Sequence, residues 1–286
     1  MLAMAIARAH PDIEIVSVDS MQVYRGMDIG TAKPTRAERE EVPHHLIDLA
    51  DPDEEFTVAR FQRLFTEVLA AIEHRAHRAL LVGGTGLYLR AVVDGLAIPG
   101  KYPDARRAFE GTATAQLHTR LAELDPVAAA RMEPSNRRRI VRALEVTVGS
   151  GRPFSSYGPG LEAYPPTPFR LVGVVLPPAR LNARVEGRYQ QQLERGFLDE
   201  VRWLADRPRG LSRTASQALG YRELLAHLRG EVELGAALEE AIRRTRQFAR
   251  RQRAWFRRDP RIEWLTADHD PMEVLPSLER IVSGQT

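Results

Sequence analysis

The segments IEIVSVDS at residues 13–20 and ALLVGGTG at residues 79–86 decide which fold the sequence predicts. Each begins with a short apolar run of the kind that forms a buried strand. The first run ends in Asp19-Ser20, and the second leads into a glycine loop and a new helix from Leu87. A strand, a loop and a helix, repeated along the chain, predict an α/β fold in which helices cover both faces of a parallel sheet.

The pattern changes after Gly100, because residues 103–148 have helical periodicity, many arginines and no strand signal. A loop rich in Gly, Pro and Ser follows, and strand character returns near residues 171–176 and 262–265. We therefore expect an α/β core over residues 1–102 and 166–286, interrupted by a helical insertion over residues 103–165.

Composition limits the function classes. The chain has 286 residues and no cysteine, which excludes disulfides, cysteine-ligated zinc and thiol catalysis and fits the cytoplasm. It contains no run of about 18 apolar residues, so we expect no contact with a membrane. The net charge is only +3, and lysine occurs only at positions 33 and 101, so the position of the arginines is the informative feature.

Two features at the predicted strand ends can carry chemistry. Asp19 follows a buried parallel strand, where a carboxylate can act as a general base, bind a metal or cap a loop. The loop Gly83-Gly84-Thr85-Gly86 can bring backbone N–H groups to a phosphate at a helix N-terminus. It can equally be a tight turn that needs glycine.

Two arginine-rich helices are candidate nucleic-acid contacts. Residues 243–258 contain eight arginines on one half of a helical wheel and no acid, which predicts unpaired charges neutralised by a polyanion rather than a solvated face. The segment NRRRIVR at residues 136–142 can bind phosphate or form an ordinary surface helix. The adjacent His44 and His45 face opposite sides of a strand and do not suggest a metal site. Three aromatic residues at helical spacings are expected in the core: Tyr189, Phe197 and Trp203.

Seven segments in order along the chain resemble tRNA dimethylallyltransferases of the bacterial type, also called tRNA isopentenyltransferases or IPP transferases. They are SVDSMQVY (17–24), GMDIGTAKP (26–34), PHHLID (43–48), GGTGLY (83–88), RIVRALEV (139–146), QALGYR (217–222) and RRQRAWF (250–256). The resemblance covers nearly the whole chain, and several of the motifs are long and specific.

The resemblance implies a P-loop-kinase-like parallel sheet whose helical insertion clamps tRNA. It implies transfer of the dimethylallyl group from dimethylallyl diphosphate to N6 of adenine 37, just 3′ of the anticodon in the tRNA anticodon stem-loop. Mg²⁺ is the implied cofactor, although no metal ligand is identifiable in the sequence, and the implied enzyme is a cytoplasmic monomer.

By position, Asp19 corresponds to the base that takes the N6 proton, and Thr85 to a residue that helps bind the transferring group and the tRNA. The resemblance and the basic helix together predict the tRNA-contacting positions: Asp19, Ser20, Met21, Gln22, Thr85, Arg106, Arg138, Arg139, Ile140, Val141, Arg142, Gln217, Gly220, Tyr221, Arg222, Arg246, Arg250 and Arg253.

The sequence departs from the family at its start. The family opens with a strand and a G-x-x-x-x-G-K-S/T loop that cradles the diphosphate, and residues 1–10 resemble the helix that follows this loop. The expected explanation is a start codon assigned too late, with the P-loop encoded in frame upstream of Met1. A degenerate, inactive product is the alternative.

Two other functions stay open at this point. One is an adenylate (AMP) prenyltransferase, against which the insertion and the basic helix argue, because a mononucleotide needs neither. The other is a catalytically inactive tRNA-binding remnant, which the missing P-loop favours and the intact Asp19 and Thr85 loops oppose.

Overall fold

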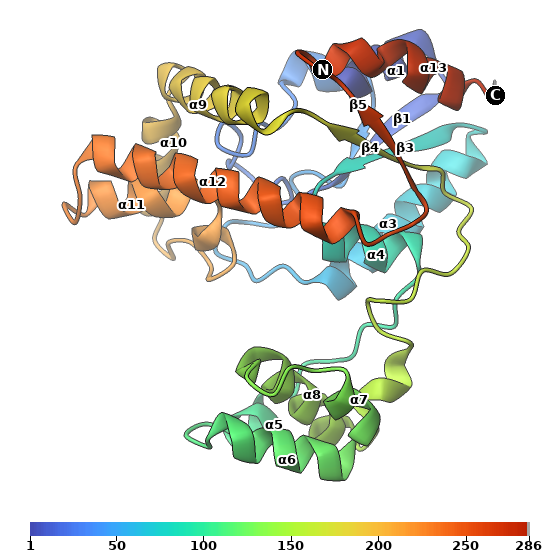
Figure 1. Cartoon of the computed structure of the whole chain (residues 1–286). Helices are drawn as coiled ribbons and strands as arrows, with labels where there is room; N and C mark the ends of the chain where they lie inside the picture. Colours follow the sequence, from blue (N-terminus) through green and yellow to red (C-terminus); the bar gives the residue numbers. More distant parts are fainter. Residues whose placement is uncertain (285–286) are drawn as a thin grey trace. The chain divides into compact units, whose positions relative to one another are not determined.

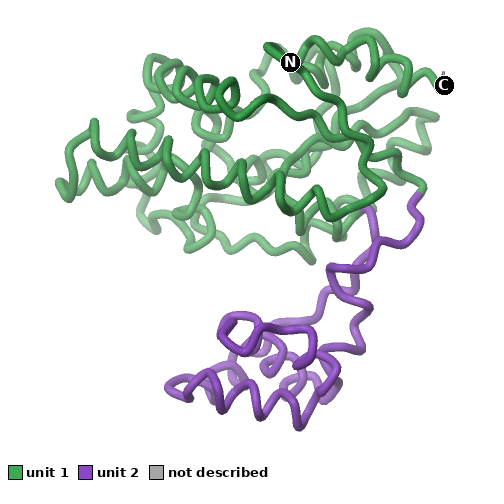
Figure 2. The backbone as a smooth tube through the Cα atoms, viewed as in Figure 1, with its two compact units in different colours: residues 1–92, 168–286 green, residues 93–167 purple. Residues whose placement is uncertain are grey.

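The computed structural model of the chain describes residues 1–284 and divides into two compact units (Figure 2). The first unit comprises Met1–Val92 and Pro168–Thr286, and the second comprises Val93–Thr167. The sequence analysis placed the insertion at residues 103–165. The segments that connect it to the core also belong to the second unit.

The first unit contains two parallel sheets. Strands β1 (Ile13–Val18), β2 (His44–His45) and β3 (Arg78–Gly83) form a sheet in the order β2-β1-β3, while β4 (Leu171–Val175) pairs with β5 (Ile262–Thr266). All pairs are parallel, as predicted. The register places Val18 opposite Gly83, so β1 and β3 end at the same edge.

Helices cover the three-stranded sheet in a layered arrangement (Figure 1). Helix α1 (Leu2–Ala9) contacts both β1 and the C-terminal helix α13 (Leu275–Val282), so the two ends of the chain share one hydrophobic cluster. Helix α3 (Val58–His74) packs against β3. Every residue of β1 is buried, as its apolar sequence predicts.

One prediction about burial is wrong. The apolar run predicts a buried strand at residues 79–82, but no residue of β3 is fully buried, and Val82 is among the exposed hydrophobic residues. The reason is that β3 is an edge strand of the described sheet and has a paired neighbour on one side only.

The first unit contains several further helices. They are α2 (Arg36–Glu41), α4 (Gly86–Val93), α9 (Pro178–Glu194), α10 (Phe197–Ala205), α11 (Tyr221–Leu228) and α12 (Leu234–Phe256), with the short 3-10 helices η2 (Ala215–Gln217) and η3 (Pro271–Val274). Helix α12 packs against α9 and α11, and α10 packs against α9 and α11. None of the helices in residues 1–284 has the length and apolar content needed to cross a membrane.

Two of the three aromatic residues expected in the core are buried. Tyr189 and Phe197 lie inside the first unit, but Trp203 is 53% exposed, so that prediction is wrong for Trp203. Its ring lies against Gly26, where an added Cβ would be 2.6 Å from the ring. Helical spacing predicts that Trp203 lies on the core face of α10. In the structure its ring covers the surface loop at Gly26 instead.

The second unit is helical, as its periodicity predicted. It contains α5 (Pro103–Arg107), α6 (Thr114–Leu124), α7 (Pro126–Ala130), α8 (Arg137–Ser150) and the 3-10 helix η1 (Phe154–Tyr157). Its core is a cluster of apolar residues from α6, α7 and α8. Glu145 is buried beside it and accepts hydrogen bonds from the Tyr102 backbone N–H and from the arginines at 106 and 142.

The N-terminal end of β1 is held by a buried carboxylate. Glu14 accepts two hydrogen bonds from Arg75 at 2.8 Å and also contacts the imidazoles of His45 and His77. The hydrogen bonds from Arg75 lower the pKa of Glu14 to about 2 against the opposing effect of burial, and the two histidines add to the lowering.

We predict a pH-dependent stability difference between the wild type and Glu14→Gln. A carboxyl whose pKa is depressed in the folded state stabilises that state above its unfolded pKa, here 4.5, and loses this contribution as the pH falls toward 2. Urea unfolding should show the variant to be less stable by roughly 2–4 kcal/mol near pH 7. The difference should shrink steadily from pH 5 to pH 2, and a constant difference would contradict the ion cluster.

Candidate functional site at the ends of β1 and β3

Asp19 lies directly after β1 and closes the turn that follows it. Its Oδ1 accepts hydrogen bonds from the backbone N–H of Met21 at 2.7 Å and of Gln22 at 3.4 Å. The side chain is half-buried, and its Oδ2 has no hydrogen-bond partner within residues 1–284. One carboxylate oxygen therefore fixes the orientation of the group, while the other stays available.

The structure brings Thr85 to the same place. Thr85 lies in the glycine loop between β3 and α4, and its Oγ1 accepts a hydrogen bond from the Ser20 backbone N–H at 3.2 Å. The Ser20 and Thr85 hydroxyl oxygens are 3.3 Å apart. The two loops predicted to carry chemistry are thus joined at the carboxyl edge of the sheet, where parallel α/β proteins bind ligands.

Helix α12 contacts the glycine loop and holds it in place. Gln252 donates a hydrogen bond from Nε2 to the Gly84 carbonyl at 2.8 Å. An added Cβ at Gly86 would lie 2.3 Å from Nε1 of Trp255, so that glycine allows the helix to approach. Neither contact was predicted as a feature of the site.

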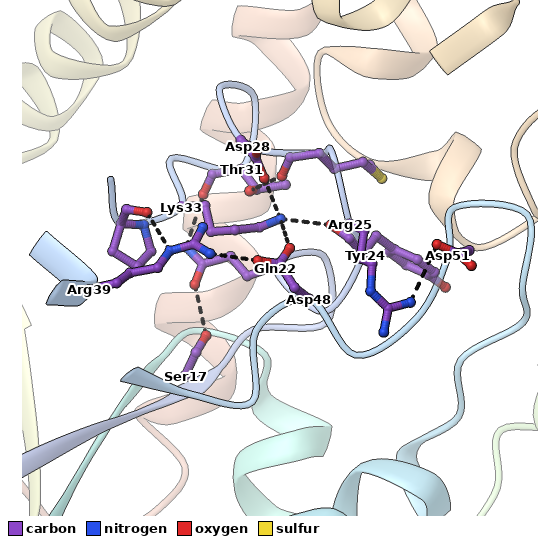
Figure 3. Close-up of polar contacts among 12 residues, drawn as sticks. Ser17, Gln22, Tyr24, Arg25, Asp28, Thr31, Lys33, Arg39, Asp48 and Asp51 are labelled. Atoms are coloured by element: carbon purple, nitrogen blue, oxygen red, sulfur yellow. Dashed lines mark hydrogen bonds and ion pairs between the residues drawn. The ribbon is translucent and has the colours of Figure 1, made fainter. Parts of the chain in front are cut away.

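Gln22 is held by its side-chain amide (Figure 3). Its Oε1 accepts from the Ser17 hydroxyl at 2.8 Å, and its Nε2 donates to the carbonyls of Thr31 and Ala32 at 3.2 and 3.3 Å. The turn after β1 is therefore connected to the loop at residues 28–33. That loop is also closed by Lys33, a residue that the sequence analysis did not assign to the site.

A half-buried carboxylate also holds this loop. Glu200 of α10 accepts hydrogen bonds from the backbone N–H groups of Asp28, Ile29 and Gly30 and from the Tyr221 hydroxyl, the last at 2.5 Å. Burial and the adjacent Glu200 carboxylate raise the pKa of Tyr221. Tyr221 is fully buried, so its side chain supports the loop from inside the first unit.

The residues of the second unit that were predicted to contact tRNA differ in burial and in ion pairing. Ile140 and Val141 are buried in its core, so their side chains stabilise the unit. Arg106 and Arg142 pair with Glu145 at 3.2 and 2.7 Å. Arg138 and Arg139 are exposed and have no ion pair within the described chain. A cavity of about 360 Å³ in this unit is lined by Arg106, Phe109, Glu110, Arg137, Arg138 and Val141.

The QALGYR segment contributes to a second cavity, which belongs to the first unit. It measures about 290 Å³ and is lined by Ser216, Gln217, Arg222, Leu225 and Arg229. Gln217 and Arg222 are exposed, whereas Gly220 has a left-handed φ of 84° and lies against Phe197. Gln217 and Arg222 are therefore the residues of this motif that a ligand can contact.

The arginines of residues 243–258 form more ion pairs than predicted. The helical wheel predicts eight unpaired arginines, but Arg243, Arg244 and Arg246 form ion pairs with Glu240, Glu223 and Glu186. Two of these acids come from other helices, which a wheel of one helix does not show. Four arginines are exposed and have no ion pair within the described residues: Arg250, Arg251, Arg257 and Arg258. Arg253 is half-buried, and its Nε has no hydrogen-bond partner there.

Comparison with known proteins shows the family of the chain. The model of the family described as IPP transferase matches residues 22–259, which is most of the chain. The chain belongs to the IPP transferase family. Curated relatives named tRNA dimethylallyltransferase include that of Desulforudis audaxviator, 46% identical over 89% of this chain and 84% of the relative. Another, from Salinispora tropica, is 48% identical over 92% and 83%.

Solved structures of IPP transferases share the fold. The full-length tRNA isopentenylpyrophosphate transferase of Bacillus halodurans is 34% identical, with a TM-score of 0.70 over 99% of this chain and 91% of that one. A eukaryotic dimethylallyltransferase, crystallised in snapshots of its action on tRNA, is 25% identical. Its TM-score is 0.81 over 100% of this chain and 76% of that one. The predicted P-loop-kinase-like α/β fold is therefore confirmed.

We predict that the IPP transferase fold of this chain tolerates no side chain at Gly83. An added Cβ would lie 2.2 Å from the Val18 carbonyl oxygen, which is backbone and moves only if β1 and β3 separate. Gly83→Ala should lower the free energy of unfolding by about 1–3 kcal/mol, as overpacking does. Thermal unfolding measures this loss.

Gly187→Ala in α9 is the matched control, because no heavy atom lies within 4 Å of its added Cβ. That change should stabilise the helix by about 0.4–1 kcal/mol. Equal melting temperatures for the two variants would show that the close approach of β1 and β3 is not required.

Proposed function

We propose that the chain is a tRNA dimethylallyltransferase. It transfers the dimethylallyl group from dimethylallyl diphosphate to N6 of adenine 37, 3′ of the anticodon, and acts as a monomer in the cytoplasm. The observation that carries this proposal is the half-buried carboxylate of Asp19, which has one oxygen available beside Thr85 at the ligand-binding edge of an IPP transferase fold.

The proposed chemistry needs a base at that point. The N6 lone pair of adenine is delocalised into the purine ring, so the amine is a poor nucleophile. As the bond from N6 to the dimethylallyl carbon forms and the carbon–oxygen bond to the diphosphate breaks, Asp19 takes the N6 proton. Pyrophosphate leaves with the bonding electron pair, and N–H donors and cations stabilise its charge.

We assign Thr85 to binding of the donor and of the adenine, because its hydroxyl lies beside Ser20 at the end of β1. Mg²⁺ would accompany the diphosphate. The described residues contain no group of three or more His, Asp or Glu side chains that could hold a metal. The site itself offers one carboxylate and two hydroxyls, so most Mg²⁺ ligands would be diphosphate and water oxygens.

We propose that the exposed arginines bind the tRNA backbone. An adenine in a loop is easier to flip out of its stack than one in a duplex, and a basic clamp around the stem holds the loop in place. The candidates are exposed arginines of three segments: Arg138 and Arg139 in α8, Arg222 in α11, and Arg250 in α12 with Arg257 just after that helix. The exposed Arg106 and the half-buried Arg142 and Arg246 are paired with acids and would contribute less.

We predict that Asp19→Asn lowers prenyl transfer to tRNA by about 10²–10⁴-fold and leaves tRNA binding nearly unchanged. Asn keeps an oxygen that can accept from the Met21 and Gln22 N–H groups, so the turn should survive. Asp12→Asn is the control, since Asp12 is an exposed carboxylate just before the opposite end of β1. Near-normal turnover of Asp19→Asn would show that another group takes the proton.

The same assay separates the alternatives, if it is run with tRNA and with AMP as acceptors and includes plain tRNA binding. Transfer to tRNA supports the proposal, transfer to AMP alone indicates an adenylate prenyltransferase, and binding without transfer indicates an inactive remnant.

We predict that Arg250→Gln/Arg257→Gln weakens tRNA binding and reduces its salt dependence together. Each lost phosphate contact should flatten the slope of log K against log salt by roughly 0.7–0.9. Glutamine keeps most of the helix propensity, so the fold should survive. Arg243→Gln should have a much smaller effect, because Arg243 is paired with Glu240. An unchanged salt slope in the double variant would show that tRNA does not contact Arg250 and Arg257.

A further inference from the structure

Lys33 is a fully buried ammonium that uses all of its protons inside the protein. Its Nζ donates to the Tyr24 carbonyl at 2.7 Å, to Asp28 at 2.5 Å and to Asp48 at 2.6 Å (Figure 3). The exposed fraction of its side chain is 0%. A lysine is rarely buried so completely, and here its charge is balanced at short range by two carboxylates.

The cluster around Lys33 is closed by a second cation. The other oxygen of Asp48 pairs with Arg39 at 2.6 Å. Burial opposes the ionisation of Asp48, but hydrogen bonds and charge from Lys33, and then from Arg39, outweigh it and hold the pKa of Asp48 below its usual value. Two positive and two negative groups therefore form one compact unit, whose geometry is costly to disturb.

This cluster fixes backbone that would otherwise be unfavourable. Asp48 has a φ of 56° and Leu46 a φ of 61°, both in the left-handed region that non-glycine residues rarely adopt. Such conformations persist where surrounding contacts hold them. The backbone N–H of Asp48 donates to the Gln22 carbonyl at 3.1 Å, so this segment lies directly against the turn that follows β1.

Two routes lead from Lys33 to that turn. In one, Lys33 holds Asp48, whose backbone N–H binds the Gln22 carbonyl. In the other, Lys33 closes the loop at residues 28–33 through Asp28, and this loop presents the Thr31 and Ala32 carbonyls to the Gln22 amide. Gln22 in turn donates its backbone N–H to Asp19.

We propose that Lys33 is a positioning residue for prenyl transfer. It contacts no reacting atom, but it holds both segments that fix Gln22, and through them it fixes the turn whose N–H groups orient the Asp19 carboxylate. The inference rests on the proposed role of Asp19 as the base. A base displaced by about 1 Å can lose roughly 10²-fold in rate, so small loop movements matter.

The test compares Lys33→Met with Glu14→Gln. Glu14 is also a buried charge in an ion cluster, and it lies on the same strand β1, but at the end opposite Asp19. Both variants should lose stability. Only Lys33→Met should lower kcat, by about 10–100-fold, with KM for tRNA nearly unchanged. If Lys33→Met does not fold, Lys33→Met/Asp48→Asn removes the half-buried carboxylate that has lost its Lys33 partner, and this double variant serves in its place.

A double-variant comparison shows whether Lys33 acts through Asp19. In the Asp19→Asn background, Lys33→Met should cause little further loss of kcat, because the group that it positions is already gone. A full additional loss would show a general structural effect and overturn the proposal. Equal losses of kcat in Lys33→Met and Glu14→Gln would overturn it as well.

Hydrogen exchange gives a readout that needs no turnover. Lys33→Met should speed exchange of the Met21 and Gln22 amides, whereas Glu14→Gln should leave them as in the wild type. Unchanged exchange in Lys33→Met refutes the positioning. A wild-type chain that transfers no prenyl group refutes the proposed function instead, so the two failures are distinguishable.

Discussion

The parallel pairing of β1 with β3 is the constraint on which the site depends. It ends both strands at one edge, with Val18 opposite Gly83, and so places the loops that contain Asp19 and Thr85 side by side. The pairing is close enough there that Gly83 has no room for a side chain. A carboxylate and a hydroxyl 66 positions apart in the chain thus share one site because the backbone of two strands allows no other register.

The loops at this edge are held mainly by polar side chains that are buried or half-buried. Lys33 and Glu200 both hold the segment at residues 28–33. Lys33 donates to the Asp28 carboxylate and to the Tyr24 carbonyl, whereas Glu200 accepts from backbone N–H groups. Burying such charges contributes little net stability compared with apolar packing of the same volume. Its benefit is geometric, because a fully satisfied polar network permits few alternative arrangements. That property suits a site whose base must be oriented.

The sequence predicted the local parts of this structure and missed the long-range ones. Strand β1, the helical insertion and the position of Asp19 follow from short apolar runs and helical periodicity, which act over neighbouring residues. The contacts of Gln252 with Gly84 and of Glu200 with the residue 28–30 backbone join segments about 170 residues apart, and no local pattern contains them. The prediction that Trp203 is buried was wrong for the same reason, because the burial of this residue depends on which distant loop its ring covers.

Helix α12 shows how the distribution of charge follows from tertiary structure. As far as Arg246, the helix forms ion pairs with α9 and α11, whose glutamates neutralise Arg246 and Arg244. Nearer its C-terminus, Gln252 and Trp255 contact the glycine loop, and the exposed arginines just before and just after them have no acidic partners in the described residues. Free positive charge is therefore concentrated on the part of the helix that also supports Thr85. The proposed binding of a tRNA backbone there would neutralise the repulsion among these arginines on the same helix that contacts the glycine loop. Electrostatic binding and the geometry of the reacting groups are in this way linked through a single helix.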